Sequence, residues 1–123
     1  PMASKLYAGS DMFLMPSRYE PCGISQMKSM RYGSIPIAHE TGGLLDTIFN
    51  FNPKTQTGTG FTFTSYTKED LLMALVRALE TFRYKDVWEH LVWRAMKTSF
   101  SWELPAKKYL ALYRRAMKKT DTV

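Results

Sequence analysis

Arg18-Tyr19-Glu20-Pro21-Cys22-Gly23-Ile24 is the stretch around which the rest of the sequence is organised. The apolar run 12–15 precedes it, Pro16-Ser17 closes that run, and a segment of helical character follows and stops at Gly33. An acid, a proline and a glycine therefore stand where a predicted strand passes into a predicted helix. In an open α/β sheet this junction lies at the carboxyl end of the strand, where ligands usually bind.

The junction has the features of a helix start that can receive an anion. Pro21 has the fixed φ angle of a first helical residue. Gly23 places no side chain over the first turn, so an anion can approach the free backbone amides there. Glu20 is then expected just outside a patch of positive potential. Spacing alone supports an ordinary interpretation equally well, in which Glu20 complements the helix dipole and Gly23 serves packing.

The composition favours one folded domain with anionic partners. The 123 residues, 45% hydrophobic and 14% aromatic, suffice for a core and argue against disorder. The net charge of +6 and pI near 9.5 favour partners such as nucleic acid or a sugar nucleotide. No apolar run approaches the ~20 residues that a spanning helix needs, so no membrane partner is expected. The single cysteine, Cys22, excludes an internal disulfide, and no residue spacing suggests a metal site.

Strand and helix patterns alternate along the chain, which predicts an α/β fold with a short, mostly parallel sheet and flanking helices. Pro36 argues against a central position for its strand, because proline cannot donate to a ladder. Segment 46–51 reads as either a short helix or an extended piece. The expected strands are 12–15, 35–38 and 60–64, and the expected helices are 22–32, 68–83, 86–98 and 101–118, with the end of another at 3–9.

Apolar residues at helical spacing predict the buried face of each main helix. Thr67 with Asp70 three residues later is a helix-start signature, Ser101 is expected to cap the last helix, and Gly33 is expected to end the first. The predicted stripes are Ile24, Met27 and Met30; Leu72, Leu75, Val76, Leu79 and Phe82; Trp88, Leu91, Val92, Ala95 and Met96; and Trp102, Ala106, Tyr109, Leu110, Tyr113 and Met117.

The wider stretch 7–23 closely resembles bacterial glycogen synthases and plant starch synthases. Further matches, in the family's order, are Met30-Arg31-Tyr32-Gly33, Thr41-Gly42-Gly43-Leu44, Gly58-Thr59-Gly60-Phe61 and Phe100-Ser101-Trp102-Glu103. The resemblance covers nearly the whole chain but only the last part of that family's protein. It implies two Rossmann-like domains with the active site in the cleft between them, an arrangement called GT-B. The chain would then be a C-terminal portion, with a donor-site part at 1–66 and C-terminal helices at 67–123.

This resemblance implies transfer of glucose from ADP-glucose to the non-reducing end of an α-1,4-glucan, with retention at the anomeric carbon and without a cofactor. It makes Glu20 the site acid, which binds glucose hydroxyls and stabilises the positively charged sugar. It also implies that backbone amides hold the departing diphosphate, that a serine hydroxyl assists, and that a second glycine turn lies near the donor. The substrate-binding residues so implied are Cys22, Gly23, Ile24, Ser25, Thr41, Gly42 and Gly43.

Lys28 departs from the wider GT-B pattern. Many such transferases have a second glutamate eight residues after the first, bound to ribose, although the glycogen synthase group also tends to depart there. Ribose recognition is thus unassigned, and these residues do not choose between ADP-glucose and UDP-glucose.

The family's Lys-Gly-Gly donor loop, its catalytic histidine and its diphosphate-clamping Arg and Lys lie upstream of Pro1. We therefore expect the chain alone to be inactive or nearly so. The family implies a bacterial cytoplasmic location, or the plastid in a plant.

A second interpretation is a non-catalytic basic α/β module that binds an anionic polymer or assembles with itself through apolar surface left uncovered by missing sheet neighbours. Basic helices with interleaved aromatics can bind nucleic acid. Here, however, Tyr109 and Tyr113 fall on the apolar stripe and the basic residues on the opposite face, which favours a solvated face and no nucleic-acid partner. The basic residues concerned are Lys107, Lys108, Arg114, Arg115, Lys118 and Lys119.

A nucleophilic role for Cys22 is not expected. A helix N-terminus lowers a thiol pKa, but cysteine catalysis needs a paired base. His39 is expected to be a loop residue of no special role near the site, and His90 to lie on a helix surface.

Overall fold

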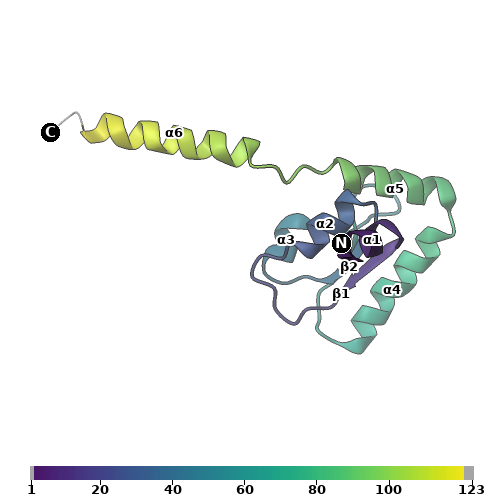
Figure 1. Cartoon of the computed structure of the whole chain (residues 1–123). Coiled ribbons are helices and arrows are strands. Elements are labelled where there is room, and N and C mark those ends of the chain that lie inside the picture. The colour runs from purple at the N-terminus through teal and green to yellow at the C-terminus, as the bar shows by residue number, and fades with distance from the viewer. Residues whose placement is uncertain (1, 121–123) are drawn as a thin grey trace.

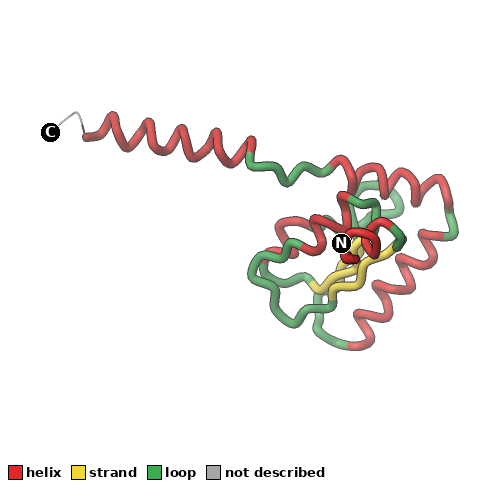
Figure 2. Tube along the Cα trace, in the orientation of Figure 1, coloured by secondary structure: helices red, strands yellow, loops and turns green. Residues whose placement is uncertain are grey.

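The computed structural model describes residues 2–120 and places a three-stranded parallel sheet among helices (Figure 1). The strand order is β1-β2-β3, and the predicted α/β class is confirmed. Figure 2 shows the strands side by side with helices around them. The elements are α1 (Met2–Ala8), β1 (Met12–Met15), α2 (Ser25–Arg31), β2 (Ile35–His39), α3 (Gly43–Thr47), β3 (Phe61–Phe63), α4 (Lys68–Phe82), α5 (Lys85–Lys97) and α6 (Glu103–Thr120).

Strand β2 is the centre of the sheet and is buried along its whole length. Its Ile35 and Ile37 join the larger core cluster with Phe61 and with the packed faces of α4 and α5, whereas Ala38 packs with α3 on a separate cluster. Successive side chains of a strand point to opposite faces, so β2 contributes to both layers. No described helix is long and apolar enough to cross a membrane.

Pro36 lies within the central strand of the sheet, so the expectation that a strand containing proline would not be central was wrong. Ile35 donates its N–H to the carbonyl oxygen of Asp11, on the β1 side, and alternation then turns the Pro36 nitrogen toward β3. Pairing with β3 begins only at the next position, where Ile37 is opposite Phe61. The missing N–H of proline therefore falls just before the ladder starts and removes no ladder bond.

The end of α2 is confirmed at Gly33, which has φ +84°. Gly33 N–H bonds to the Met30 carbonyl and Ser34 N–H bonds to the Ser29 carbonyl, which is the Schellman arrangement. The buried side chains of this helix are Gln26, Ser29 and Met30, so the predicted stripe was correct only for Met30. Ile24 is exposed because it precedes the helix.

Helix α4 begins as predicted, because the Thr67 side chain accepts a hydrogen bond from the Asp70 N–H. The predicted stripe of this helix was mostly wrong, however: Leu72, Val76 and Leu79 are exposed by 59%, 42% and 54%. Ala74 and Ala78 are fully buried instead. Small side chains let the helix axis approach the sheet closely, whereas a hydrophobicity pattern favours the larger residues. In α5 the prediction holds for Trp88, Leu91 and Ala95, which are buried; Val92 is partly buried and Met96 is exposed.

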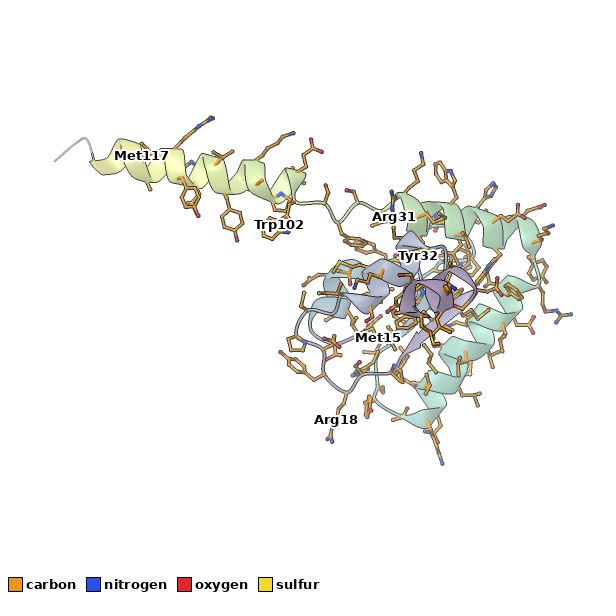
Figure 3. The ribbon with its side chains drawn as sticks, in the orientation of Figure 1. Met15, Arg18, Arg31, Tyr32, Trp102 and Met117 are labelled. Carbon is orange, nitrogen blue, oxygen red and sulfur yellow. The ribbon has the colours of Figure 1, made fainter. Side chains whose placement is uncertain are left out.

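Helix α6 extends away from the body of the molecule, and its residues up to Met117 are exposed (Figures 1 and 3). Its predicted apolar stripe is therefore not buried within the described residues. Ser101 is not its cap, because the first helical bond runs from the Ala106 N–H to the Trp102 carbonyl. The side chains of Lys118 and Lys119 fall outside the described part of the chain.

The outer edge of β3 is closed by side chains. The Thr62 N–H donates to Asn50 Oδ1 at 3.1 Å, and the Thr62 carbonyl accepts from Arg77 Nη2. Arg77 Nη1 also donates to Asn50 Oδ1 at 3.1 Å, which links the two closing groups. An open edge strand presents unpaired groups that invite pairing with another chain, and this arrangement removes them at Thr62.

We predict that Arg77→Met lowers the free energy of unfolding by about 1–2 kcal/mol, because the Thr62 carbonyl and Asn50 lose a charged donor. Urea unfolding followed by circular dichroism measures this. Arg83→Met is the matched control, since Arg83 bonds only to the exposed Glu80 on the same helix, and it should change stability by less than about 0.5 kcal/mol. Equal effects of the two substitutions would contradict the edge-closing role.

Candidate functional site

Two turns meet at the carboxyl end of the sheet, and together they form the candidate site. The first, 20–24, follows β1, and the second, 41–43, follows β2. Because β1 and β2 are parallel neighbours, segments that follow them emerge at the same edge. The structure thus brings together the acid, the first glycine turn and the second glycine turn.

The two turns touch through their backbones. The Gly43 N–H donates to the Glu20 carbonyl at 2.9 Å. A Cβ atom at Gly42 would overlap that same carbonyl oxygen, and a Cβ atom at Gly43 would overlap the carbonyl of Cys22. Gly42 also has φ +47°, which L side chains rarely adopt. Both glycines are therefore required by contact between main chains.

The expected helix start at Pro21 was wrong, because α2 begins only at Ser25. Pro21 and Cys22 lie in a bend, and Gly23 has φ +71°, which interrupts any helical path through this segment. The amides of Cys22, Gly23 and Ile24 thus belong to a turn before the helix and not to its first turn. Gly23 is required for its conformation and because a Cβ atom there would overlap the Gln26 side chain.

Gln26 orients that turn, and sequence reasoning missed it. Its side chain is fully buried, and its Nε2 lies 3.3 Å from the Cys22 carbonyl and 3.1 Å from the Gly23 carbonyl. In a trans peptide the N–H points opposite to the C=O. Because both carbonyls point to Gln26, the N–H groups of Gly23 and Ile24 point away from it; Gly23 is buried, whereas Ile24 is exposed. No local signal distinguishes a buried glutamine of this kind from an exposed one on a helix.

Thr47 of α3 joins this arrangement and couples the two turns a second time. Gln26 Nε2 lies 3.1 Å from Thr47 Oγ1, and Thr47 in turn donates to the Gly43 carbonyl at 2.9 Å. One side-chain amide is therefore linked to both turns. The Oε1 atom of Gln26 is buried without a hydrogen-bond partner in the described structure, so the donors of this side chain determine its orientation.

Glu20 and Ser25 have free polar groups beside these amides. Neither the half-buried Glu20 carboxylate nor the Ser25 hydroxyl makes a hydrogen bond or ion pair with another residue in the described range 2–120. Glu40, a second acid at this edge, differs: its carboxylate accepts from Thr62 Oγ1 at 2.6 Å and from Thr64 Oγ1 at 3.1 Å. Glu40 is therefore held on β3, while Glu20 keeps its capacity to accept. Arg18 extends away from the sheet (Figure 3).

His39 is not a loop residue, which corrects the expectation. It ends β2 and is buried, with Nδ1 at 2.9 Å from the Ser17 carbonyl and Nε2 at 3.2 Å from the Thr64 carbonyl. The ring thereby ties the turn after β1 to the end of β3. Cys22 is an exposed free thiol, and His90 is exposed on α5 as expected. Both ring nitrogens of His39 face backbone carbonyls and not Cys22, so His39 is not placed to act as a base for this thiol.

Comparison with known proteins identifies relatives. The sequence model described as "Glycosyl transferases group 1" matches residues 3–88. The chain is 52% identical over 118 residues to a glycogen synthase of Clostridium novyi (strain NT), covering 96% of this chain and 25% of that protein. It is 54% identical over 119 residues to a glycogen synthase of Thermosipho melanesiensis, again covering 96% and 25%.

A solved structure supports the same relationship. The catalytic domain of starch synthase IV from Arabidopsis thaliana, bound to ADP and acarbose, superposes with a TM-score of 0.82 at 43% identity, covering 91% of this chain and 24% of that one. The chain therefore spans about a quarter of the length of the relatives that it matches.

We predict that Gln26→Met, which keeps the size of the side chain and removes its donors, lowers the free energy of unfolding by about 1–3 kcal/mol. The reason is that the buried carbonyls of Cys22 and Gly23 lose their partner. Urea unfolding measures the change. Gln56→Met is the matched control, because Gln56 is exposed in a loop, and it should be close to neutral. A stable Gln26→Met protein with unchanged amide shifts at Gly23 and Ile24 would contradict the orienting role.

Proposed function

The chain belongs to the group 1 glycosyl transferases, and from this we propose that it carries the donor-side half of a glycogen or starch synthase active site. The proposed reaction moves glucose from ADP-glucose to the non-reducing end of an α-1,4-glucan, with retention at the anomeric carbon. The relatives that support it are glycogen synthases at 52–54% identity and a starch synthase whose structure holds ADP and acarbose. The complete reaction is proposed for the longer protein that such relatives represent.

One observation carries the proposal: the turn that holds Glu20, whose carboxylate has no partner among the described residues, directs the Cys22 and Gly23 carbonyls to Gln26 and is pressed against Gly42 and Gly43. The Gly23 and Ile24 amides of the same turn therefore point away from Gln26. Transfer from a nucleotide sugar develops negative charge on the diphosphate and positive charge on the sugar ring. A site for this reaction needs donors and an acceptor close together. The carboxyl end of this sheet offers both.

The donors would stabilise the leaving group. Backbone amides fixed in advance need not reorganise as charge develops, and one such donor is typically worth about 3 kcal/mol in the transition state. We assign this role to Gly23 and Ile24, with the Cys22 amide beside them and the Ser25 hydroxyl as a further donor. Burial of Gln26 beneath the turn keeps the amides in place.

Glu20 would act on the sugar. Its carboxylate would accept hydrogen bonds from glucose hydroxyls and stabilise the positively charged ring by charge, without forming a covalent bond. The turn Thr41-Gly42-Gly43 would line the donor on the other side, where its glycines let it pack closely against the turn of Glu20. Ribose recognition is not assigned to Lys28, and no residue of this chain is assigned the role of the upstream Arg and Lys of the family.

The proposal is tested by titrating ADP into the ¹⁵N-labelled chain and following backbone amide shifts. Saturable shifts are expected at Gly23 and Ile24. Gly23→Val should weaken ADP binding by at least about tenfold. Gly23 has φ +71° and a Cβ atom there would overlap the Gln26 side chain, so the substitution distorts the turn that holds the amides. Hydrogen bonds from such amides to a charged group are worth about 1.5–3 kcal/mol each. Ser25→Ala, which leaves the amides uncovered, should have a much smaller effect.

Shifts confined to 107–119 that shrink as salt is added would contradict this placement and favour a general anion-binding face on α6. Unchanged shifts at Gly23 and Ile24 in a folded sample would count against a diphosphate site formed by this chain on its own.

We also propose that the isolated chain associates with a second copy of itself. Two exposed apolar stripes support this, one on α4 with Leu72, Val76 and Leu79, the other on α6 with Tyr109 and Tyr113. The Tyr109 and Tyr113 rings are tilted toward each other with centroids 6.4 Å apart, and both side chains are exposed. Contiguous exposed apolar surface of this kind usually marks an interaction site.

Sedimentation of the purified chain should therefore give a mass that rises with protein concentration. Tyr109→Glu with Tyr113→Glu should shift this equilibrium toward the monomer, because it places charge on the stripe. A monomer at all concentrations would contradict the proposed association.

A further inference from the structure

Two adjoining hollows lie along the C-terminal half of α5, and their walls share Lys97 and Thr98. The first, of about 520 Å³, lies between α5 and the loop that leads into β3, where Gly58 and Arg94 face each other. The second, of about 440 Å³, lies between α2 and the segment that follows α5, with Lys28 and Arg31 in its wall. We call the two together the basic groove.

The basic groove has four cationic side chains and no carboxylate. Lys28, Arg31, Arg94 and Lys97 line it, and no Asp or Glu does. The ion pairs within the described residues involve other lysines and arginines, so no carboxylate compensates these four charges. Uncompensated charges of one sign in a concave surface attract counter-charged ligands strongly.

Arg94 is the most constrained of the four. Its Nε donates to the Gly58 carbonyl at 3.1 Å, its guanidinium lies over the Phe51 ring at 5.9 Å, and its Nη2 is buried without a hydrogen-bond partner in the described chain. Burial lowers the pKa of the Arg94 guanidinium, because removing its charge from water is unfavourable. An anion in the groove would offset that penalty.

An ordinary explanation accounts for part of this cluster. Cations near a helix C-terminus are favourable for the helix dipole, and Arg31 donates to the Met96 carbonyl at 3.0 Å at the end of α5. Lys97 lies over the Trp93 ring at 4.9 Å. The dipole explanation extends to all four cations, because Lys28 and Arg31 lie in the last turn of α2 and Arg94 and Lys97 lie in the last turn of α5. It does not account for the buried Nη2 of Arg94, which has no hydrogen-bond partner among the described residues.

The basic groove includes Lys28, one helical turn after Ser25, and extends away from the site proposed above. Parallel strands place every segment that leads into a strand at one end of the sheet and every segment that follows a strand at the other. Arg31, at the end of α2, and Gly58 precede β2 and β3, so the groove extends to the amino end. Glu20 and Gly43 follow β1 and β2 and lie at the carboxyl end. Figure 3 shows Arg31 next to α5 and away from Arg18, which precedes Glu20.

We propose that the basic groove is a second binding site, for a ligand that carries more than one phosphate group. Arginine forks match the geometry of phosphate oxygens, and two joined hollows with cations in each suit a multivalent anion better than a single carboxylate. The hydroxyls of Thr98, Ser99 and Ser101 and the exposed Trp93 ring offer further contacts to a hydroxyl-rich ligand body. Free phosphorylated metabolites and phosphate esters on a polysaccharide share this chemistry.

The test is a titration of pyrophosphate into the ¹⁵N-labelled chain, with shifts read at Gly58, Thr98, Ser99 and the Trp93 indole. These shifts should saturate together. Lys28→Gln with Lys97→Gln should weaken binding at these positions about tenfold, since each removes one partly screened charge contact. The matched control is Lys107→Gln with Lys108→Gln, which makes the same change in net charge on α6 and should leave the affinity unchanged. Circular dichroism confirms that each variant is folded.

Shifts at Gly23 and Ile24 are recorded separately in the same spectra, so failure at one site is distinguished from failure at the other. A second arm compares phosphorylated maltoheptaose with neutral maltoheptaose. Tighter binding of the phosphorylated sugar than of pyrophosphate would assign the groove to polysaccharide esters, and the reverse order would assign it to free phosphorylated metabolites. Equal weakening by the α6 control, equal binding of neutral maltoheptaose, or no saturable shift around the groove would each overturn the proposal.

Discussion

The contact between two backbones at the carboxyl end of the sheet is the constraint on which the rest of this structure depends. Gly43 donates to the Glu20 carbonyl, and neither Gly42 nor Gly43 could carry a Cβ atom without overlapping the turn after β1. Such close approach fixes the ends of β1 and β2 relative to each other. It also fixes the start of α2 and of α3, because each helix begins within a few residues of its turn.

Buried polar side chains then hold the two turns in the positions that the close contact of the glycines allows. Gln26 bonds to the first turn and, through Thr47, to the second, while the His39 ring lies between the carbonyls of Ser17 and Thr64, within hydrogen-bond distance of each. Buried polar groups stabilise a single arrangement only when they find partners, so these bonds specify the positions of the loops and not merely their proximity. The result is an edge where the Gly23 and Ile24 amides point away from Gln26 and where the Glu20 carboxylate, unlike that of Glu40, has no partner among the described residues.

The two ends of the sheet thus differ in how they are built. At the carboxyl end, backbone amides and the unpaired carboxylate of Glu20 lie on the two closely packed turns that follow β1 and β2. At the amino end, cationic side chains from α2 and α5 gather around hollows without a carboxylate. A parallel sheet separates these ends by the length of its strands, which allows one small unit to present two chemically distinct surfaces. Apolar stripes on α4 and α6 remain uncovered in a chain that spans about a quarter of its relatives.

The sequence by itself determined the features that depend on neighbouring residues. The strand at 12–15, the helices that became α4 and α5, the Thr67 cap and the stop at Gly33 all follow from local propensity and capping, which act within one or two turns. The stretch 7–23 together with further matches in the family's order was enough to indicate the family, whereas the spacing of Glu20 and Gly23 alone was not. The α/β class followed from the alternation of the elements.

Only the tertiary structure decided the features that depend on residues far apart in the chain. It moved the start of α2 to Ser25, because the positive φ of Gly23 is set by contact with the second turn and with Gln26. Pro36 fits in the central strand because pairing with β3 begins only at the next residue. Ala74 and Ala78 are buried, and their larger neighbours are not, because α4 lies close to the sheet. The roles of Gln26 and His39 have the same origin: a side chain finds such partners only after the strands have brought their turns together.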